Sequence, residues 1–243
     1  MGIQSAEFFI NLTPTSTVMH KVSIVGIDNT GKSSIVNSLN SIEGVETIHL
    51  TTFQNSDSYI AKHTGNLVYY LARFGERSEL RMLTGLSYLF HLVPYAFEQA
   101  TKNNCRVLVS DRDPIIDPLC YVHSYLPGIA GKAIKPVLKK SLKTFFRLPD
   151  SFIYLTSTPD LSADRDKEKS QLHGKIEKIS RINKILNQEM LLKENEDIPV
   201  KRIDTNEKSL EEVTIEVHGH IKSICFSTSN EVLQPTLPSL DSA

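Results

Sequence analysis

Short apolar, β-branched runs alternate along this chain with longer segments in which apolar residues recur at helical spacing. The runs that predict strands cover 21–26, 46–52, 105–110, 151–156 and 198–203. The segments that predict helices cover 32–42, 58–74, 79–102, 133–146, 170–192 and 208–223. This alternation indicates an α/β fold, with a parallel sheet covered by helices on both faces. Ligands are then expected at the carboxyl ends of the strands.

The last two predicted helices have the clearest patterns. The fifth carries an apolar stripe of Leu172, Ile176, Ile179, Ile182, Leu186 and Met190. The sixth opens with Ser209 and Glu212, which have the spacing of a capping box. The third, 79–102, is apolar enough to suit a homodimer face, although an internal core helix has the same pattern.

Both ends of the chain lack such a period. Residues 1–19 are interpreted as a flexible leader, and Met19 is an alternative to Met1 as the true start. Residues 226–243, rich in Ser and Thr with two Pro, are expected to form a disordered tail. A single domain is expected to span 20–225, with a lid at about 160–175.

The composition excludes several classes of protein. The chain has 243 residues, with 27 basic and 28 acidic side chains, so no basic excess favours a nucleic-acid polymer or an anionic membrane as partner. No apolar run reaches the length of a membrane span. The three cysteines, Cys105, Cys120 and Cys225, have neither zinc nor disulfide spacing, which predicts small buried side chains and a cytoplasmic location.

The segment Gly26-Ile-Asp-Asn-Thr-Gly-Lys-Ser33 follows the first predicted strand and opens the first predicted helix. It matches G-x-x-x-x-G-K-S, the Walker A phosphate-binding loop, whose N–H groups surround a triphosphate. Lys32 is expected to reach the β- and γ-phosphates, and the Ser33 hydroxyl to ligate Mg²⁺. The residues expected to bind nucleotide here are Gly26, Asn29, Thr30, Gly31, Lys32, Ser33 and Ser34.

A second motif ends the third predicted strand. Asp111 follows the apolar run from Val107 and has the position of a Walker B carboxylate, which holds Mg²⁺ directly or through water. Arg112 can grip a phosphate with its guanidinium fork, or it can form a salt bridge with Asp111 or Asp113. Asp113 and Asp117 either cap the turns around Pro114 and Pro118 or face an acceptor pocket.

Together these segments resemble the thymidylate kinase group of P-loop kinases. The resemblance rests on Gly26-Ile27-Asp28 before Thr-Gly-Lys-Ser, on Ser110-Asp111-Arg112 and on Tyr121. It implies a three-layer P-loop NTPase fold, with a five-stranded parallel sheet and a helical lid. It also implies ATP as phosphoryl donor and Mg²⁺ as cofactor. The residue roles that it implies are acceptor binding for Asp28, Arg112 and Tyr121, catalysis for Lys32, Asp111 and Arg165, and adenine contact for Asp204 and Thr205.

The chain departs from that family where the family binds its acceptor. Thr52-Phe-Gln-Asn55 lacks the usual arginine, no arginine lies between Arg81 and Arg106, Asp113 replaces an aromatic residue, and Val122 replaces a Gln. The expected function is therefore ATP-dependent phosphoryl transfer to a nucleoside monophosphate or a nucleoside. The alternatives are a kinase of another small hydroxyl acceptor and a non-catalytic ATP-binding module. A small GTPase is disfavoured because Asn183-Lys184 is not followed by the Asp of a guanine motif.

Overall fold

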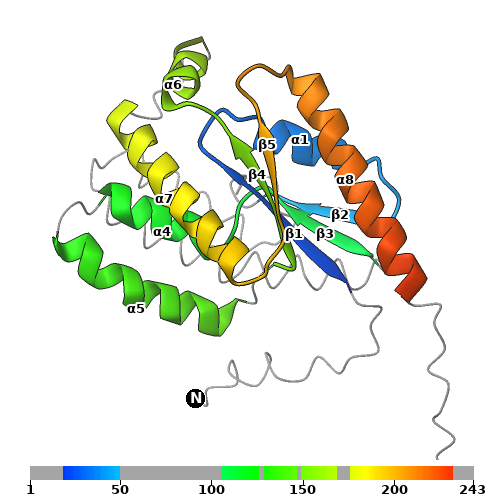
Figure 1. The fold of residues 1–243 in the computed structure, drawn as a ribbon, viewed down its shortest axis with the longest axis horizontal. Helices are drawn as coiled ribbons and strands as arrows, with labels where there is room; N and C mark the ends of the chain where they lie inside the picture. The colour runs from blue at the N-terminus through cyan, green and yellow to red at the C-terminus, as the bar shows by residue number, and fades with distance from the viewer. Residues whose placement is uncertain (1–18, 50–104, 126–128, 147–148, 169–175, 232–243) are drawn as a thin grey trace, which may run out of the picture.

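A five-stranded, fully parallel sheet forms the centre of the computed structural model, which describes residues 19–49, 105–125, 129–146, 149–168 and 176–231 (Figure 1). The strands are β1 (His20–Gly26), β2 (Val45–Ile48), β3 (Val107–Ser110), β4 (Ser151–Thr156) and β5 (Val200–Asp204). Their order in the sheet is β2-β3-β1-β4-β5, and every neighbouring pair is parallel. The predicted α/β class and the five-stranded parallel sheet are confirmed.

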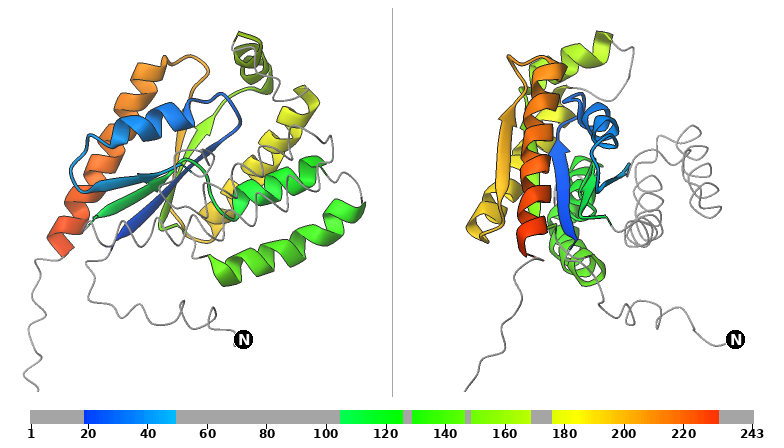
Figure 2. Two further views of the ribbon diagram at one scale, coloured as in Figure 1. Left: turned by 180° about the vertical axis from the view of Figure 1, so that it is seen from behind. Right: turned by 90° about the vertical axis from the view of Figure 1, so that its right-hand side faces the viewer.

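Helices cover both faces of this sheet (Figures 1 and 2). Those described are α1 (Lys32–Leu39), α4 (Ile116–Tyr125), α5 (Ile129–Phe145), α6 (Pro159–Glu168), α7 (Ile176–Asn195) and α8 (Leu210–Glu231). Helices α1 and α8 pack on one face, and α4 and α7 pack on the other. Helix α5 packs against α4, and α6 lies near the carboxyl ends of the strands. The predicted helices 58–74 and 79–102 lie outside the described residues.

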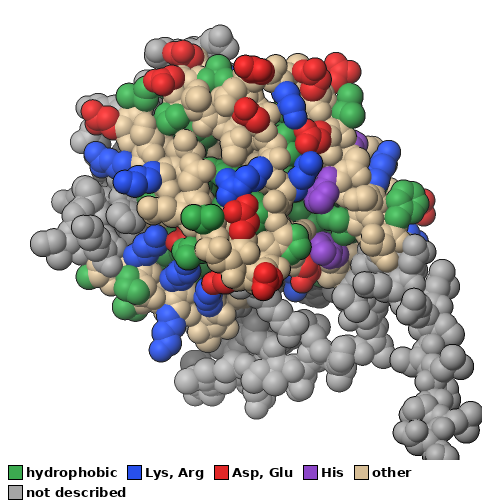
Figure 3. Space-filling view, in the orientation of Figure 1, with side chains coloured by type: hydrophobic (Ala, Val, Ile, Leu, Met, Phe, Trp, Pro, Cys, Tyr) green, Lys and Arg blue, Asp and Glu red, His purple; other side chains and the backbone are tan. Residues whose placement is uncertain are grey.

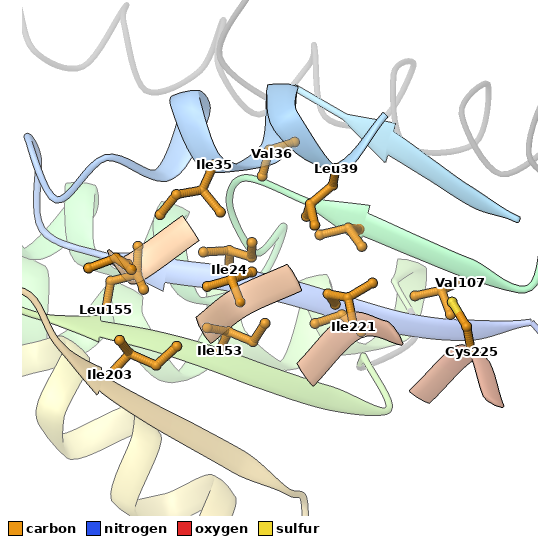
Figure 4. Packing of buried hydrophobic residues seen from close by; sticks show 14 residues of the cluster. Ile24, Ile35, Val36, Leu39, Val107, Ile153, Leu155, Ile203, Ile221 and Cys225 are labelled. Atoms are coloured by element: carbon orange, nitrogen blue, oxygen red, sulfur yellow. The ribbon is translucent and has the colours of Figure 1, made fainter. Parts of the chain in front are cut away.

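Strand β4 shows how the two cores arise from one sheet. Ile153 and Leu155 point toward α1 and α8, where they join the cluster drawn in Figure 4. Phe152 and Tyr154 point the other way and pack against α4 and α7. Because alternate residues of a strand face opposite sides, a strand buried on both faces is apolar at almost every position. This explains the continuous apolar runs in the sequence.

Helix α4 is an element that the sequence analysis missed. Asp113 caps it, because its Oδ1 accepts hydrogen bonds from the backbone N–H groups of Ile115 (2.9 Å) and Ile116 (2.6 Å). Pro114 follows the cap at the first helical position, where its missing N–H costs nothing. Asp117 accepts a hydrogen bond from the backbone N–H of Asp113 at 2.8 Å. The Asp-Pro pair is a local signal from which the start of this helix could have been predicted.

The buried cap makes stability depend on pH. Asp113 is fully buried, and this burial raises the pKa of its carboxyl from 3.8 to about 6. The folded state then binds the proton more tightly than the unfolded state does. The stabilisation that results is present below pH 4 and is lost as pH rises through 6. We expect Asp113→Asn, which keeps an oxygen for the cap, to remove this loss. Its free energy of unfolding relative to the original chain should rise by about 2 kcal/mol between pH 4 and pH 7 in urea titrations. A constant difference between the two proteins across that range would contradict the prediction.

The ends of several elements differ from those predicted. Strand β2 stops at Ile48, earlier than expected, and α8 continues to Glu231, so a disordered tail from residue 226 is wrong for 226–231. Cys225, the residue before this segment, is buried in the core cluster of α1 and α8. The start of α8 is as predicted, because Ser209 and Glu212 exchange the hydrogen bonds of a capping box. Residues 1–18 and 232–243 lie outside the described part.

Two further expectations concern the cysteines and the membrane. Cys105, Cys120 and Cys225 are free and buried, which confirms their interpretation as small core side chains. Among the helices that the structure describes, none combines the length and apolar character needed to cross a bilayer.

Candidate functional site

The glycine-rich loop leaves β1 at the point where the strand order of the sheet reverses. Strand β1 pairs with β3 on one side and with β4 on the other, and α1 begins directly after the loop. Such a reversal opens a crevice at the carboxyl ends of parallel strands, where ligands bind. No side chain caps the start of α1, so its first N–H groups and its positive dipole end face this crevice.

Three residues give the loop its shape. Asn29 and Gly31 both have positive φ angles, 61° and 88°, a conformation that Asn tolerates and Gly adopts without strain. Gly26 is held closely, because a Cβ atom there would lie 2.7 Å from the carbonyl oxygen of Leu155. The Thr30 side chain is turned into the loop and donates to the carbonyl of Ile27 at 2.9 Å, so Thr30 can offer a ligand only its backbone. Ser34 is exposed on α1 beside the crevice.

Lys32 lies folded back on the loop. Its Nζ donates to the carbonyl oxygens of Gly26 (2.8 Å) and Ile27 (2.7 Å). Only 6% of the residue is exposed, and burial, followed by the nearby Arg112, lowers the pKa of the ammonium group to about 8. Backbone carbonyls are the weaker partners for an ammonium group, and an anion at the loop would attract it more strongly. The geometry therefore places a cation ready to turn toward a phosphate.

Ser33 and Asp111 meet across the edge of the sheet. The exposed Ser33 hydroxyl donates to Oδ2 of Asp111 at 3.2 Å, and Asp111 is 1% exposed. Both were predicted to hold Mg²⁺, and their juxtaposition follows from the direct pairing of β1 with β3. A hydroxyl and a carboxylate are hard oxygen donors, which is the ligand chemistry that Mg²⁺ takes beside substrate phosphates. Within the described ranges, no three His, Cys, Asp or Glu side chains gather as a metal site. Ser33 and Asp111 would thus contribute one hydroxyl and one carboxylate to a metal ion.

His49 is a site residue that the sequence analysis missed. Its Nδ1 lies 3.1 Å from Oδ2 of Asp111. His49 falls inside the strand predicted over 46–52, whereas β2 ends at Ile48 and His49 is the first residue beyond it. A histidine at the carboxyl end of a strand that pairs with β3 is the signal from which it could have been found.

Arg112 forms ion pairs with two acids that are not its neighbours in sequence. Its guanidinium donates to Oδ1 of Asp117 at 3.0 Å and to Oδ1 of Asp28 at 3.2 Å. A salt bridge with Asp111 or Asp113, the alternative to phosphate binding, is not among the ion pairs described for Arg112. Asp113 is committed to the cap of α4, and Asp117 emerges one helical turn later on the side that faces the loop. Burial raises the pKa of the Asp117 carboxyl, and the charge of Arg112 opposes that rise.

These charged groups form one end of a small pocket beside the loop, which has room for about one water molecule. The apolar remainder comes from α4 and α7. The lining residues are Gly26, Ile27, Asp28, Arg112, Asp117, Cys120, Ile182 and Leu186. Of the three predicted acceptor residues, Asp28 and Arg112 therefore line one pocket. The third, Tyr121, lies on α4, but its side chain is outside the described part of the structure.

Helix α6 docks on the loop from the other side. The Ser162 hydroxyl, which the sequence analysis did not single out, donates to the carbonyl of Asp28 at 2.7 Å. Arg165 donates to the carbonyl oxygens of Asn29 (3.3 Å) and Thr205 (3.0 Å). The predicted lid cation thus lies at the loop, where it connects the loop to the segment after β5. The rest of the predicted lid, 169–175, lies outside the described residues.

The side chains of the two residues predicted to contact adenine form hydrogen bonds within the protein. Thr205 is buried, and its hydroxyl donates to the carbonyl of Thr156 on β4 at 2.9 Å. The Asp204 carboxylate accepts hydrogen bonds from the backbone and side chain of Asn206. Asn206 in turn accepts from the backbone N–H of Thr158 at 2.9 Å. These hydrogen bonds hold the segment after β5 in a turn, whose backbone groups can bind a base.

No family model matches this chain. A search of curated proteins also returns no match.

Proposed function

We propose that this protein is a P-loop kinase that transfers the γ-phosphoryl group of ATP to a small acceptor, either a hydroxyl of a nucleoside or the phosphate of a nucleoside monophosphate. One observation carries the proposal. A Walker A loop with its lysine and serine lies where the strand order of the parallel sheet reverses. The hydroxyl of Ser33 lies 3.2 Å from Oδ2 of Asp111, a buried carboxylate at the end of the neighbouring strand. Phosphoryl transfer needs positioning and charge neutralisation at this kind of edge, and little covalent chemistry from the protein.

The residues of the loop divide the work as follows. The N–H groups at the start of α1 bind the phosphates, and Lys32 turns from the carbonyls of Gly26 and Ile27 to the β- and γ-phosphates. Asp28 orients the acceptor hydroxyl or accepts its proton. A bond then forms between the acceptor oxygen and the γ-phosphorus, the bond to the bridging oxygen breaks, and ADP leaves. Ser33 and Asp111 would hold Mg²⁺, which neutralises charge on the phosphates when bound.

Two cations and two acids lie around the pocket. The Arg112 guanidinium is shared between Asp28 and Asp117, and the Lys32 ammonium group interacts with the same two carboxylates. Because these carboxylates already neutralise both cations, we expect a hydroxyl of the acceptor at this point more readily than a second anion. Arg73, Arg77 and Arg81 lie outside the described residues, so the choice between nucleoside and monophosphate is left to experiment.

A small-molecule acceptor also suits the surface. Lys and Arg side chains are interspersed with Asp and Glu on the face seen in Figure 3, and the net charge of the whole chain is −1. A nucleic-acid polymer would favour a basic stripe.

The contacts of Arg165 allow a test of whether its positive charge alone or also the shape of its guanidinium group is needed. Its fork joins two backbone carbonyls, one in the loop and one after β5, and a lysine ammonium cannot reach both with the same geometry. We expect Arg165→Ala and Arg165→Lys to lower kcat/KM for ATP alike, by about 10- to 100-fold. Arg181→Ala, which removes an exposed arginine from α7, serves as the control. Full activity in Arg165→Lys would show that a positive charge alone suffices.

A non-catalytic ATP-binding module is the second candidate. The observation that favours it is that Lys32 and Arg165 both donate to backbone carbonyls, which would brace a loop that only binds and closes. Such a module would bind ATP and transfer phosphate to nothing.

The deciding experiment measures ADP release from Mg-ATP by the purified chain. The acceptor panel consists of nucleosides, nucleoside monophosphates and unrelated small alcohols, and Lys32→Ala provides the blank. Stimulation by one class, lost in the variant, would establish the kinase and its acceptor. ATP binding without stimulation by any acceptor would favour the binding module.

A further inference from the structure

His49 and Asp111 are brought together by the register of two strands. Strands β2 and β3 are parallel, with Ile48 paired to Ser110, so their next residues emerge side by side. The backbone N–H of Asp111 donates to the carbonyl of Ile48 at 3.1 Å, which continues the pairing beyond the strands. The histidine ring therefore reaches the carboxylate from a fixed position, and not from a loose loop.

The hydrogen bond between His49 and Asp111 defines which ring nitrogen of His49 carries the proton. Nδ1 of His49 lies 3.1 Å from Oδ2 of Asp111, and an ionised carboxylate can only accept. Nδ1 therefore carries the proton in this contact. The opposite nitrogen, Nε2, is buried and has no hydrogen-bond partner in the described part of the chain. Burial of an unpaired ring nitrogen is destabilising, so stability alone does not explain a histidine here.

Oδ2 of Asp111 accepts from two donors, the Nδ1–H group of His49 and the hydroxyl of Ser33. Ser33 is exposed and belongs to the phosphate-binding loop, so its hydroxyl is free to rotate when a ligand enters. The His49 ring is only 21% exposed and keeps its contact from the sheet. A carboxylate that holds a metal ion is commonly oriented by such an outer partner.

We propose that His49 is a positioning residue for Asp111, which holds the carboxylate in the orientation that Mg²⁺ binding at the loop requires. The inference rests on the proposed function only in that ATP and Mg²⁺ bind together at this loop. It does not depend on whether phosphate is transferred or on which acceptor is used.

The test measures ATP affinity by calorimetry across a range of Mg²⁺ concentrations, for the full chain and four variants. His49→Leu removes the donor to Asp111 and keeps much of the volume. His49→Asn keeps an amide N–H near the position of Nδ1 and removes Nε2. Asp111→Asn, alone and combined with His49→Leu, completes a double-mutant cycle. Thermal unfolding without nucleotide shows whether each variant is folded.

We expect His49→Leu to raise the Mg²⁺ concentration for half-maximal ATP binding by about 10- to 100-fold. His49→Asn should remain within about threefold of the original chain, and His49→Leu should add little once Asp111 is already Asn. An unchanged Mg²⁺ dependence in His49→Leu would overturn the proposal. So would His49→Asn behaving like His49→Leu, or an undiminished effect of His49→Leu in the Asp111→Asn background.

The outcome can be separated from that of the proposed function. Absence of phosphoryl transfer, together with the expected shift in Mg²⁺ dependence, would refute the kinase and support the role of His49. Phosphoryl transfer with an unchanged Mg²⁺ dependence in His49→Leu would support the kinase and refute the role of His49. If His49→Leu does not fold, the comparison of His49→Asn with Asp111→Asn decides: parallel losses in Mg²⁺ dependence would count against the proposal, and retention in His49→Asn would support it.

Discussion

Replacing Lys32 with alanine is expected to lower phosphoryl transfer by about 10²- to 10³-fold and to weaken ATP binding. Removal of one positioned donor from charge that develops in a transition state costs about this much. The loss should not arise from unfolding, because burial disfavours the ammonium group, whose pKa falls from 10.5 to about 8. Because this burial penalty offsets what its two hydrogen bonds to the loop contribute, the thermal midpoint of the variant should stay close to that of the original chain.

The measurement combines ADP release with ATP binding and thermal unfolding on the same preparations. Lys140→Ala is the matched control, because Lys140 is an exposed lysine on α5, away from the loop. If Lys32→Ala retained more than a tenth of the transfer rate, the assigned role of this lysine would be wrong. If it lost several degrees of thermal midpoint, the interpretation of its buried ammonium group would be wrong as well.

The second large effect is expected at Asp111. Asp111→Asn keeps the size of the side chain and an oxygen for Ser33 and His49, but it removes the negative charge of a residue that is 1% exposed. We expect transfer at limiting Mg²⁺ to fall by about 10²-fold and to recover in part at high Mg²⁺, because a weakened metal site is refilled by mass action. Initial rates over a series of Mg²⁺ concentrations measure both effects.

Asp113→Asn provides the control two residues away. Asp113 is an equally buried carboxylate, but its oxygens face the start of α4 and Ser23 instead of the loop serine. Its transfer rate should stay within about twofold of the original chain while its stability changes with pH as described above. Equal losses in the two variants would mean that the region needs buried charge in general. An Asp111→Asn rate that does not depend on Mg²⁺ would remove Asp111 from the metal site.

The glycine-rich loop and the ion pairs beside it differ in how far they could be predicted. The segment from Gly26 to Ser33 is contiguous, so its backbone angles and the start of α1 follow from local sequence. Asp111 could be placed because an acid that ends a buried parallel strand must emerge at the carboxyl edge. Even the start of α4 carried a local signal in Asp113 and Pro114, although the sequence analysis interpreted these residues as a turn.

The partners of Arg112, His49 and Arg165 could not be predicted in this way. Arg112 has acids on both sides in sequence, yet it pairs with Asp117, one helical turn on, and with Asp28, 84 residues away. His49 contacts a residue 62 positions away because two strands share a register. Arg165 reaches the loop, 136 residues away, because α6 docks there.

The hydrophobic period and the short motifs act over a few residues, so they were enough to predict the glycine-rich loop, the α/β class and the strands beside the loop. The ion-pair partners of Arg112, the contact of His49 with Asp111 and the position of Arg165 came from the fold alone. Those contacts depend on strand order, register and helix docking, which arise from the packing of two apolar cores. The sequence around the contacting residues therefore carries no local signal of the contact.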